Sequence, residues 1–198
     1  RSPMLTVRES RHIIGDYVYA EDSVLLGRRF PDTVTIADTD FDTHGLQASA
    51  IARLGYMPYH KDDKHARFPY RVCLPKGIEG LLVTGKAFSS AKDAANFGRM
   101  EPDLQNLGYA CGRAAEMAVT ARCGLRDIDT GQLTGHLLEI GSVHQDDIGE
   151  GSEEGMATKT AVAGIAHGDE KALLSVLYAD ETAVVSLLEE AYGRAEGK

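Results

Sequence analysis

The stretch "FPYRVCLPKGIEGLLVTGKAFSS", residues 68–90, decides the fold of this chain. A short apolar run, Leu81-Leu82-Val83, stops at Thr84-Gly85, and a polar loop without glycine follows. Strands of this kind, which end in glycine and lead to a helix of small residues, often bring backbone close to a ligand. We therefore expect a strand at 81–84 whose end, Gly85, faces a ligand.

A turn precedes that expected strand. Pro75 supplies a fixed φ angle and Gly77 a permissive one, as a chain reversal requires. On the other side of the turn, residues 70–74 are predicted to form a second strand. The expected order is therefore a strand, a turn at Pro75-Lys76-Gly77, and the strand that ends before Gly85.

The clearest predicted helix is "EPDLQNLGYACGRAAEMAVTARCG", residues 101–124, in which apolar residues recur at three- and four-residue spacing. Pro102 suits the first helical position and Asp103 the electropositive first turn, and Gly124 is the expected C-terminal cap. Gly108 and Gly112 each cost about 1 kcal/mol relative to alanine within a helix. We expect a strand or a ligand to approach this helix closely enough to offset that cost.

The flanking segments carry weaker signals. Residues 4–19 read as strand-like, a short helix is expected to end at Gly27, and "DTVTIAD", residues 32–38, reads as a strand. After the long helix, "DTGQLTGHLLEIG" is amphipathic, and the acidic run "HQDDIGEGSEEG", residues 144–155, reads as a solvated linker. Two amphipathic helices are expected beyond it, at 169–179 and 180–195, with Asp169 and Asp180 near their N-caps.

The composition excludes several functional classes. The chain has 198 residues and a net charge of −9, which disfavours non-specific binding to nucleic acid or to an anionic membrane. No stretch approaches the roughly 18 apolar residues that span a bilayer. Three cysteines without metal-ligand spacing favour reduced, buried thiols over a disulfide framework or a structural zinc. The cellular location stays open, with the cytoplasm favoured.

The best candidate site lies where the expected strand, Gly85, Arg99 and the helix beginning at Pro102 meet. A helix N-terminus carries about half a positive charge and free N–H donors, and Arg99 adds a full charge beside it. Together they would stabilise an anion or the electron-rich edge of a heterocycle. The alternative is an ordinary strand–helix corner with a solvated arginine, because one helix start is a weak signal.

Six short motifs follow one another along the chain. They are Arg8-Glu9-Ser10-Arg11 leading into Gly15-Asp16-Tyr17, Asp42 with His44, Pro69-Tyr70-Arg71, Pro75-Lys76-Gly77, the run from Leu81 to Lys86, and Arg99 with Pro102. In this order they resemble FAD-dependent oxidoreductases of the glutathione-reductase-like fold, in the branch found with fumarate-reductase-type and ketosteroid-dehydrogenase-type flavoproteins. The resemblance covers about residues 6–141, and the shared order, more than any single motif, argues against coincidence.

The resemblance implies an α/β fold: the C-terminal part of a Rossmann-like FAD-binding flavoprotein, with part of a substrate-capping sheet and a short C-terminal helical appendage. It implies hydride transfer between a small organic substrate and the flavin, with FAD as the cofactor. The residues it places at the cofactor are Gly85, Lys86, Arg99, Met100, Pro102, Asp103 and Leu104. The tail beyond residue 160 resembles the start of a helical-repeat extension.

Three further residues are candidates for the substrate side. Arg8 and Arg11 would supply cations for an anionic or polarised oxygen, and His44 would transfer a proton near neutral pH. Residues three apart on a strand face opposite sides, so both arginines line one pocket only if the chain bends. For His44 the alternative is a hydrogen-bonded turn with Asp42.

Three departures from the family pattern affect these expectations. The stretch "SAKDAANFG", residues 90–98, replaces one that often holds a histidine in the family, so Lys92 and Asp93 are not expected to serve its role. Lys86 stands where the family usually has arginine, which keeps the charge but loses the planar fork. The dinucleotide fingerprint GxGxxG does not occur in the chain, and in this family it holds the FAD pyrophosphate near the start of the polypeptide. We therefore expect this chain to be incomplete and inactive alone. Its expected partner is the N-terminal FAD-binding part of the same protein or a second chain.

These inferences divide the chain into four parts. Residues 1–70 would belong to the substrate or cap region, 71–142 to the FAD-binding domain, 143–159 to an acidic linker and 160–198 to a helical appendage. The competing class is a non-catalytic subunit or scaffold that uses the flavoprotein-like lobe and the helical tail for protein interaction.

Overall fold

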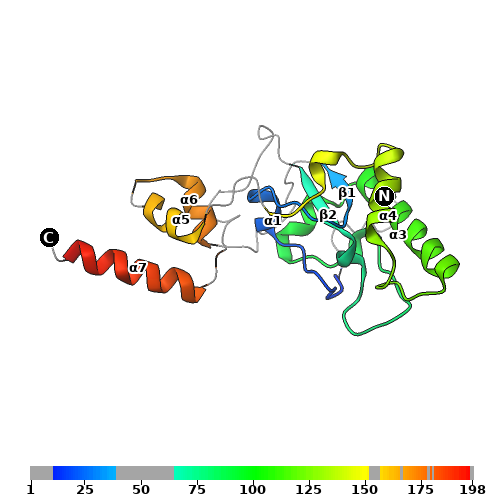
Figure 1. Ribbon diagram of the computed structural model, residues 1–198, viewed down its shortest axis with the longest axis horizontal. Coiled ribbons are helices and arrows are strands. Elements are labelled where there is room, and N and C mark those ends of the chain that lie inside the picture. Colours follow the sequence, from blue (N-terminus) through cyan, green and yellow to red (C-terminus); the bar gives the residue numbers. More distant parts are fainter. Residues whose placement is uncertain are drawn as a thin grey trace, which may run out of the picture.

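A computed structural model describes residues 11–38, 65–151, 157–165, 167–177, 179 and 181–196. Figure 1 shows two groups of elements, a larger one that contains the sheet and α3, and a smaller one that contains α5, α6 and α7. The larger group is mixed helix and strand, as expected for a piece of an α/β protein, and it carries the candidate site.

The sheet has two antiparallel strands, β1 (Thr33–Ala37) and β2 (Ala66–Pro69). Thr35 pairs with Phe68 and Ala37 with Ala66, and a register shift lies between Thr33 and Thr35. The run TVTIA is rich in β-branched residues, which suits a strand. The predicted strand at 32–38 is therefore confirmed, although both faces of β1 are largely buried.

Helix α3 (Glu101–Ala121) packs against β1 and against α4 (Thr130–Glu139). Its buried side chains follow the predicted apolar spacing. Asp129 caps α4, because its side chain accepts a hydrogen bond from the Gln132 N–H. The predicted cap of α3 is wrong: the left-handed residue that ends the helix is Arg122, with φ 54°, and not Gly124.

Two predicted strands are also wrong. Tyr70–Cys73 forms a 3₁₀ turn, η1, and residues 81–84 have no regular structure. A strand requires a partner elsewhere in the chain. Among the described residues, the 81–84 segment donates one backbone hydrogen bond outside regular elements, from the Val83 N–H to the Cys73 carbonyl at 2.9 Å. Short 3₁₀ turns follow at η2 (Gly85–Ala87) and η3 (Lys92–Phe97). The short helix before Gly27 is confirmed as α1 (Glu21–Leu25).

The start of the acidic segment packs against the domain, contrary to the expectation of a solvated linker. Val143 is fully buried, and Asp147, in the turn η4 (Gln145–Asp147), forms a buried ion pair with Arg67 at 2.8 Å. Ile148 bridges to Phe30, and the Gly151 carbonyl accepts from the Arg29 N–H at 3.0 Å. Residues 143–151 therefore belong to the larger group. The division into four parts otherwise stays a prediction.

The smaller group contains three helices: α5 (Thr158–Ile165), α6 (Glu170–Leu177) and α7 (Glu181–Glu196). Two of them match predicted helices, and α5 is additional. Helix α5 contacts both α6 and α7, and the buried residues of the three helices include Ala161, Val162, Ala172 and Val184. The Asp169 side chain accepts from the Ala172 N–H at the start of α6, as predicted, and Asp180 lies outside the described residues. None of the described helices is long and apolar enough to cross a bilayer.

Candidate functional site

The turn η2 presents Gly85 on an open surface. Gly85 has φ +71°, a conformation that residues with a side chain rarely adopt, and a Cβ added there would meet nothing within 4 Å. The turn contacts α3. Because Gly85 has no side chain, another group can approach its backbone from the direction in which a Cβ would point.

The N-terminus of α3 has no side-chain cap. Met100 occupies the N-cap position without capping through its side chain, and the first helical hydrogen bond runs from the Leu104 N–H to the Met100 carbonyl at 3.1 Å. Pro102 has no N–H, so it adds no orphan donor at this end. The 21-residue helix thus directs its positive end at the surface beside the half-buried Arg99. An anion or an electron-rich edge would be stabilised there.

Asp103 lies in the first turn of α3, where the helix dipole favours a negative charge, but its side chain is buried. Its residue is 8% exposed, and its Oδ2 atom has no hydrogen-bond partner. Burial first, and the charge of Asp38 second, raise the pKa of the Asp103 carboxyl to about 6. Desolvation therefore outweighs the favourable position at a helix N-terminus.

A polar cavity of about 370 Å³ lies beside Asp103. Its lining carries carboxylate, imidazole, amide and hydroxyl groups: Asp38, His65, Asp103, Asn106, Ser142, His144 and Asp147, with Ile36. The carboxylate of Asp38 contacts the His65 ring. In the described ranges, no group of three or more His, Cys, Asp or Glu side chains is arranged to hold a metal ion.

The candidate substrate residues are only partly placed. Arg8 and His44 lie outside the described residues. Arg11 is exposed, and the segment that follows it contacts the last residue of η2 and the residue after it. The Ile13 N–H donates to the Ala87 carbonyl at 3.1 Å, and the His12 ring bonds the Phe88 carbonyl at 3.0 Å. The structure thus brings the Arg11 segment close to Gly85, 74 positions away in the sequence.

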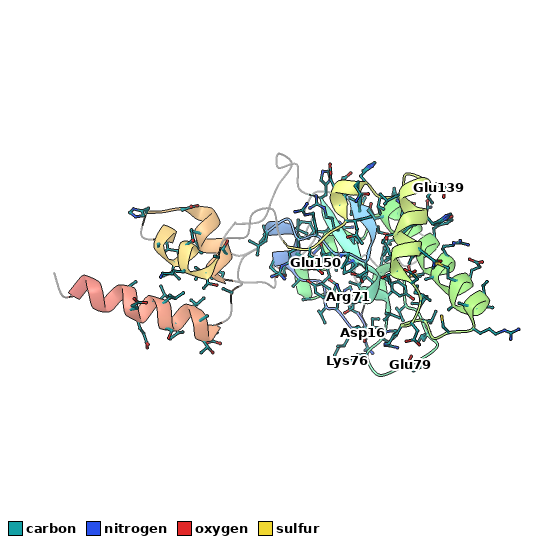
Figure 2. The ribbon with its side chains drawn as sticks, viewed as in Figure 1. Asp16, Arg71, Lys76, Glu79, Glu139 and Glu150 are labelled. Carbon is teal, nitrogen blue, oxygen red and sulfur yellow. The ribbon has the colours of Figure 1, made fainter. Side chains whose placement is uncertain are left out.

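A second cleft, of about 570 Å³, lies along the side where Figure 2 shows Glu150, Arg71 and Asp16. Arg71 makes two side-chain bonds of 2.9 Å to the carboxylate of Asp32, and its guanidinium lies 5.4 Å from the Tyr17 ring centroid. The Asp32 hydrogen bond is the main reason that the pKa of Arg71 is raised. Arg126, by contrast, holds together Asp16, Glu79 and the Pro75 and Ile78 carbonyls. That arginine ties the 75–79 loop to the domain.

Sequence reasoning missed several residues of these sites. The partners Asp32–Arg71 and Arg67–Asp147 are distant in sequence, and no local spacing relates them. The motifs Pro69-Tyr70-Arg71 and Gly15-Asp16-Tyr17 mark Arg71 and Asp16 in the sequence without indicating their partners.

The chain belongs to the FAD-dependent oxidoreductase family: residues 2–137 match the family described as "FAD dependent oxidoreductase". FAD is the cofactor of this family, and oxidoreductase activity is its general function. No curated protein and no solved structure matches the chain. The matched range includes η2, α3 and most of α4, so both parts of the candidate site fall within it.

Proposed function

We propose that this chain supplies the flavin side of an FAD site in an enzyme that transfers a hydride between a small organic substrate and the flavin. The single observation that carries the proposal is the uncapped N-terminus of α3 beside Arg99, in a family whose cofactor is FAD. When bound, FAD accepts or donates the hydride at its flavin ring. The chain's own residues bind the ring, orient it and adjust its electrostatic surroundings.

Two features of the chain, the backbone at Gly85 and the N-terminus of α3, suit the flavin ring. Gly85, with its open surface, allows a planar ring to approach the backbone. The backbone from Met100 to Leu104 would stabilise negative charge on the pyrimidine edge of the ring. Arg99, just before the helix, and Lys86, in η2, would add positive charge. These groups would raise the reduction potential, because they favour the more negative, reduced flavin.

Asp103 contributes to this site through its backbone only. A charged carboxylate beside a reduced flavin would oppose the effect of the helix N-terminus. Its side chain lies instead at the polar cavity with Asp38 and Asn106. We assign that side chain to the packing of α3, and the cofactor contact to the backbone around it.

The substrate side is proposed from Arg8, Arg11 and His44. The support for it is the position of the Arg11 segment, whose neighbour Ile13 is hydrogen-bonded to η2. Arg11 is expected to attract an anionic or polarised oxygen of the substrate, and His44 to move a proton. In a His44→Gln variant, the rate of flavin reduction should fall and lose its dependence on pH near neutrality. An unchanged rate and pH profile would make His44 structural.

We also propose that the nucleotide half of FAD is held by sequence outside these 198 residues, in the same protein or in a second chain. The support is the absence of GxGxxG from the printed sequence. An intact mass of every chain in the purified, flavin-containing protein tests this. A flavin-containing sample that holds only this 198-residue chain would contradict it.

The test of the main proposal is Arg99→Ala in the flavin-loaded protein. The reduction potential should fall and FAD should dissociate more readily, while Arg99→Lys should recover part of both. Arg113→Ala is the matched control, because Arg113 lies on the same helix and pairs with Glu116. Equal values for Arg99→Ala, Arg113→Ala and the unmodified protein would remove Arg99 from the site.

A further inference from the structure

The polar cavity beside Asp103 is formed where three parts of the domain meet. Its lining comes from β1 and the residue after it, from the first turns of α3, and from the segment around η4. Asp103 and Asn106 are three positions apart on α3, so they share one face of the helix. The side chains of Asp38 and His65 are 70% and 45% exposed, whereas Asp103 and Asp147 are buried. The cavity thus combines exposed groups, past which a small molecule can enter, with buried carboxylates.

Two of the three carboxylates in this cavity already have a partner. Asp147 forms its buried ion pair with Arg67 at 2.8 Å, and Asp38 contacts the His65 ring. The packing of α3 buries Asp103, but its Oδ2 atom has no hydrogen-bond partner among the described residues. The charge of Asp38, which acts on the Asp103 carboxyl, has the same sign. Because a buried charge without a partner is costly, the Asp103 carboxylate calls for a positive group beside it.

A second buried oxygen at the cavity also lacks a hydrogen-bond donor. Ser142 lines the cavity just after α4, and its Oγ atom has no partner within the part of the chain that the structure describes. A carboxylate oxygen can only accept a hydrogen bond, and a hydroxyl oxygen can accept one as well. Buried polar atoms in native proteins nearly always have a partner. Two such oxygens at one cavity therefore indicate a ligand that supplies N–H or O–H donors.

The ligand should carry both donors and a positive charge. Water supplies donors but leaves the charge of Asp103 without a counter-charge. A metal ion requires several ligands at fixed distances, and no three His, Cys, Asp or Glu side chains of the described ranges are arranged to hold one. A protonated primary amine has three N–H donors and a full charge, as in lysine. Its carbon chain can lie against Ile36, and a cavity of about 370 Å³ is large enough for a small ligand.

We propose that this cavity is a binding site for a small organic ammonium ion, with the Asp103 carboxylate as its counter-charge. The carboxylate accepts one N–H of the ammonium group, and the Ser142 hydroxyl accepts another. Asp38, at the exposed side of the cavity, adds negative potential that attracts the cation. The site does not depend on the proposed flavin contact, which uses the backbone at the start of α3 and not the Asp103 side chain.

Isothermal titration calorimetry of the intact protein with propylammonium chloride tests this site. The titration is made above about pH 7, because the pKa of the Asp103 carboxyl is about 6 and the carboxylate is then charged. Propanol, which has the same carbon chain without the charge, and magnesium chloride are the ligand controls. Propylammonium should bind, propanol should not, and magnesium ions should not displace the bound amine.

Two variants locate the bound amine. Asp103→Asn keeps the shape of the side chain but removes its charge, so it should weaken propylammonium binding by about tenfold or more. Glu116→Gln is the matched control, because Glu116 lies on the same helix, about 20 Å further along, and its side chain is 54% exposed. This variant should bind propylammonium as tightly as the unmodified protein.

Four results would overturn the proposal. Propanol that binds as tightly as propylammonium would mean that the cavity does not recognise charge, and displacement by magnesium would make it a metal site. Equal affinities of Asp103→Asn and Glu116→Gln would place the bound amine elsewhere, and no binding of propylammonium would leave the cavity without this ligand. Because three of these comparisons use only the unmodified protein, the conclusion stands even if Asp103→Asn does not fold.

Discussion

At Gly15 the backbone passes so close to its neighbours that a side chain has no room. A Cβ there would lie 2.7 Å from the Ser89 Cβ and 3.0 Å from the Arg71 carbonyl oxygen. The Gly15 N–H also donates to the Ser89 hydroxyl at 2.9 Å. The sequence motif Gly15-Asp16-Tyr17 marks this glycine, but no local spacing reveals its close approach to Ser89, 74 positions away.

Gly15→Ala should lower the free energy of unfolding by about 1–3 kcal/mol, as expected for overpacking. Gly135→Ala is the control, because Gly135 lies in α4 with nothing within 4 Å of an added Cβ. That change should raise stability by about 0.5–1 kcal/mol. Urea unfolding of both variants measures this, and equal effects of the same sign would contradict the packing described for Gly15.

Asp103 makes stability depend on pH in a predictable direction. Its pKa in the folded protein is about 6, above the ordinary value of 3.8, so the folded state binds the proton more tightly than the unfolded state. Between these values the free energy of unfolding contributed by this carboxyl falls as pH rises. Below about pH 4 the buried carboxyl is protonated and does not destabilise the fold, and above about pH 7 the destabilisation by its charge is fully present.

The free energy of unfolding of Asp103→Asn, relative to that of the unmodified protein, should therefore rise by about 1–3 kcal/mol from pH 4 to pH 7. One pKa unit corresponds to about 1.36 kcal/mol. Urea unfolding at intervals across that range measures the difference between the two proteins. A difference that stays constant with pH would contradict the burial of this carboxyl.

At the scale of elements, helices were predicted better than strands. The buried face of α3 was predictable because it depends on a local pattern, the helical spacing of Leu107, Cys111 and Ala118. The expected strand at 81–84 depended on a partner that no local pattern reveals. The same reason explains the acidic segment, since the charge pattern around Asp147 indicated solvent while its partner Arg67 lies 80 positions away.

The Arg67–Asp147 pair is predicted to hold η4 against β2. Arg67→Met would leave a buried carboxylate without its partner and should cost about 3–5 kcal/mol. Arg113→Met, which removes an exposed pair with Glu116 on α3, should cost about 0–1 kcal/mol. Thermal or urea unfolding compares the two, and a similar small loss in both would mean that η4 is not held by this contact.

At the scale of the whole molecule, the helices α5, α6 and α7 form a group whose main contacts are with one another. A chain that ends at Gly151 should therefore keep the melting temperature of the larger domain within a few degrees. A chain that ends at Ser142 should melt markedly lower, because it also loses Val143 and Asp147 from the core. Equal melting temperatures for the two shortened chains would contradict the packing of residues 143–151.

The family and its cofactor were predictable from the order of short motifs, and the match over residues 2–137 confirms them. The Rossmann-like detail, the substrate and the roles of individual site residues stay predictions. The order of the motifs marks Arg11, Gly85 and Arg99 as candidates, but sequence spacing does not reveal which of them lie around one ligand.

The most direct test of the flavin site compares two glycines with the same backbone requirement. Gly85 has φ +71° and Gly77 has φ +74°, and an added Cβ meets nothing within 4 Å at either position. Valine at either position should therefore cause a similar loss of stability, while only Gly85 lies at the proposed flavin contact. The measurement is the FAD dissociation constant of Gly85→Val and Gly77→Val in the intact protein. We predict at least a tenfold weaker FAD affinity for Gly85→Val (about 1.4 kcal/mol) and an unchanged one for Gly77→Val. Equal FAD affinities in the two variants would contradict the placement of the flavin at Gly85.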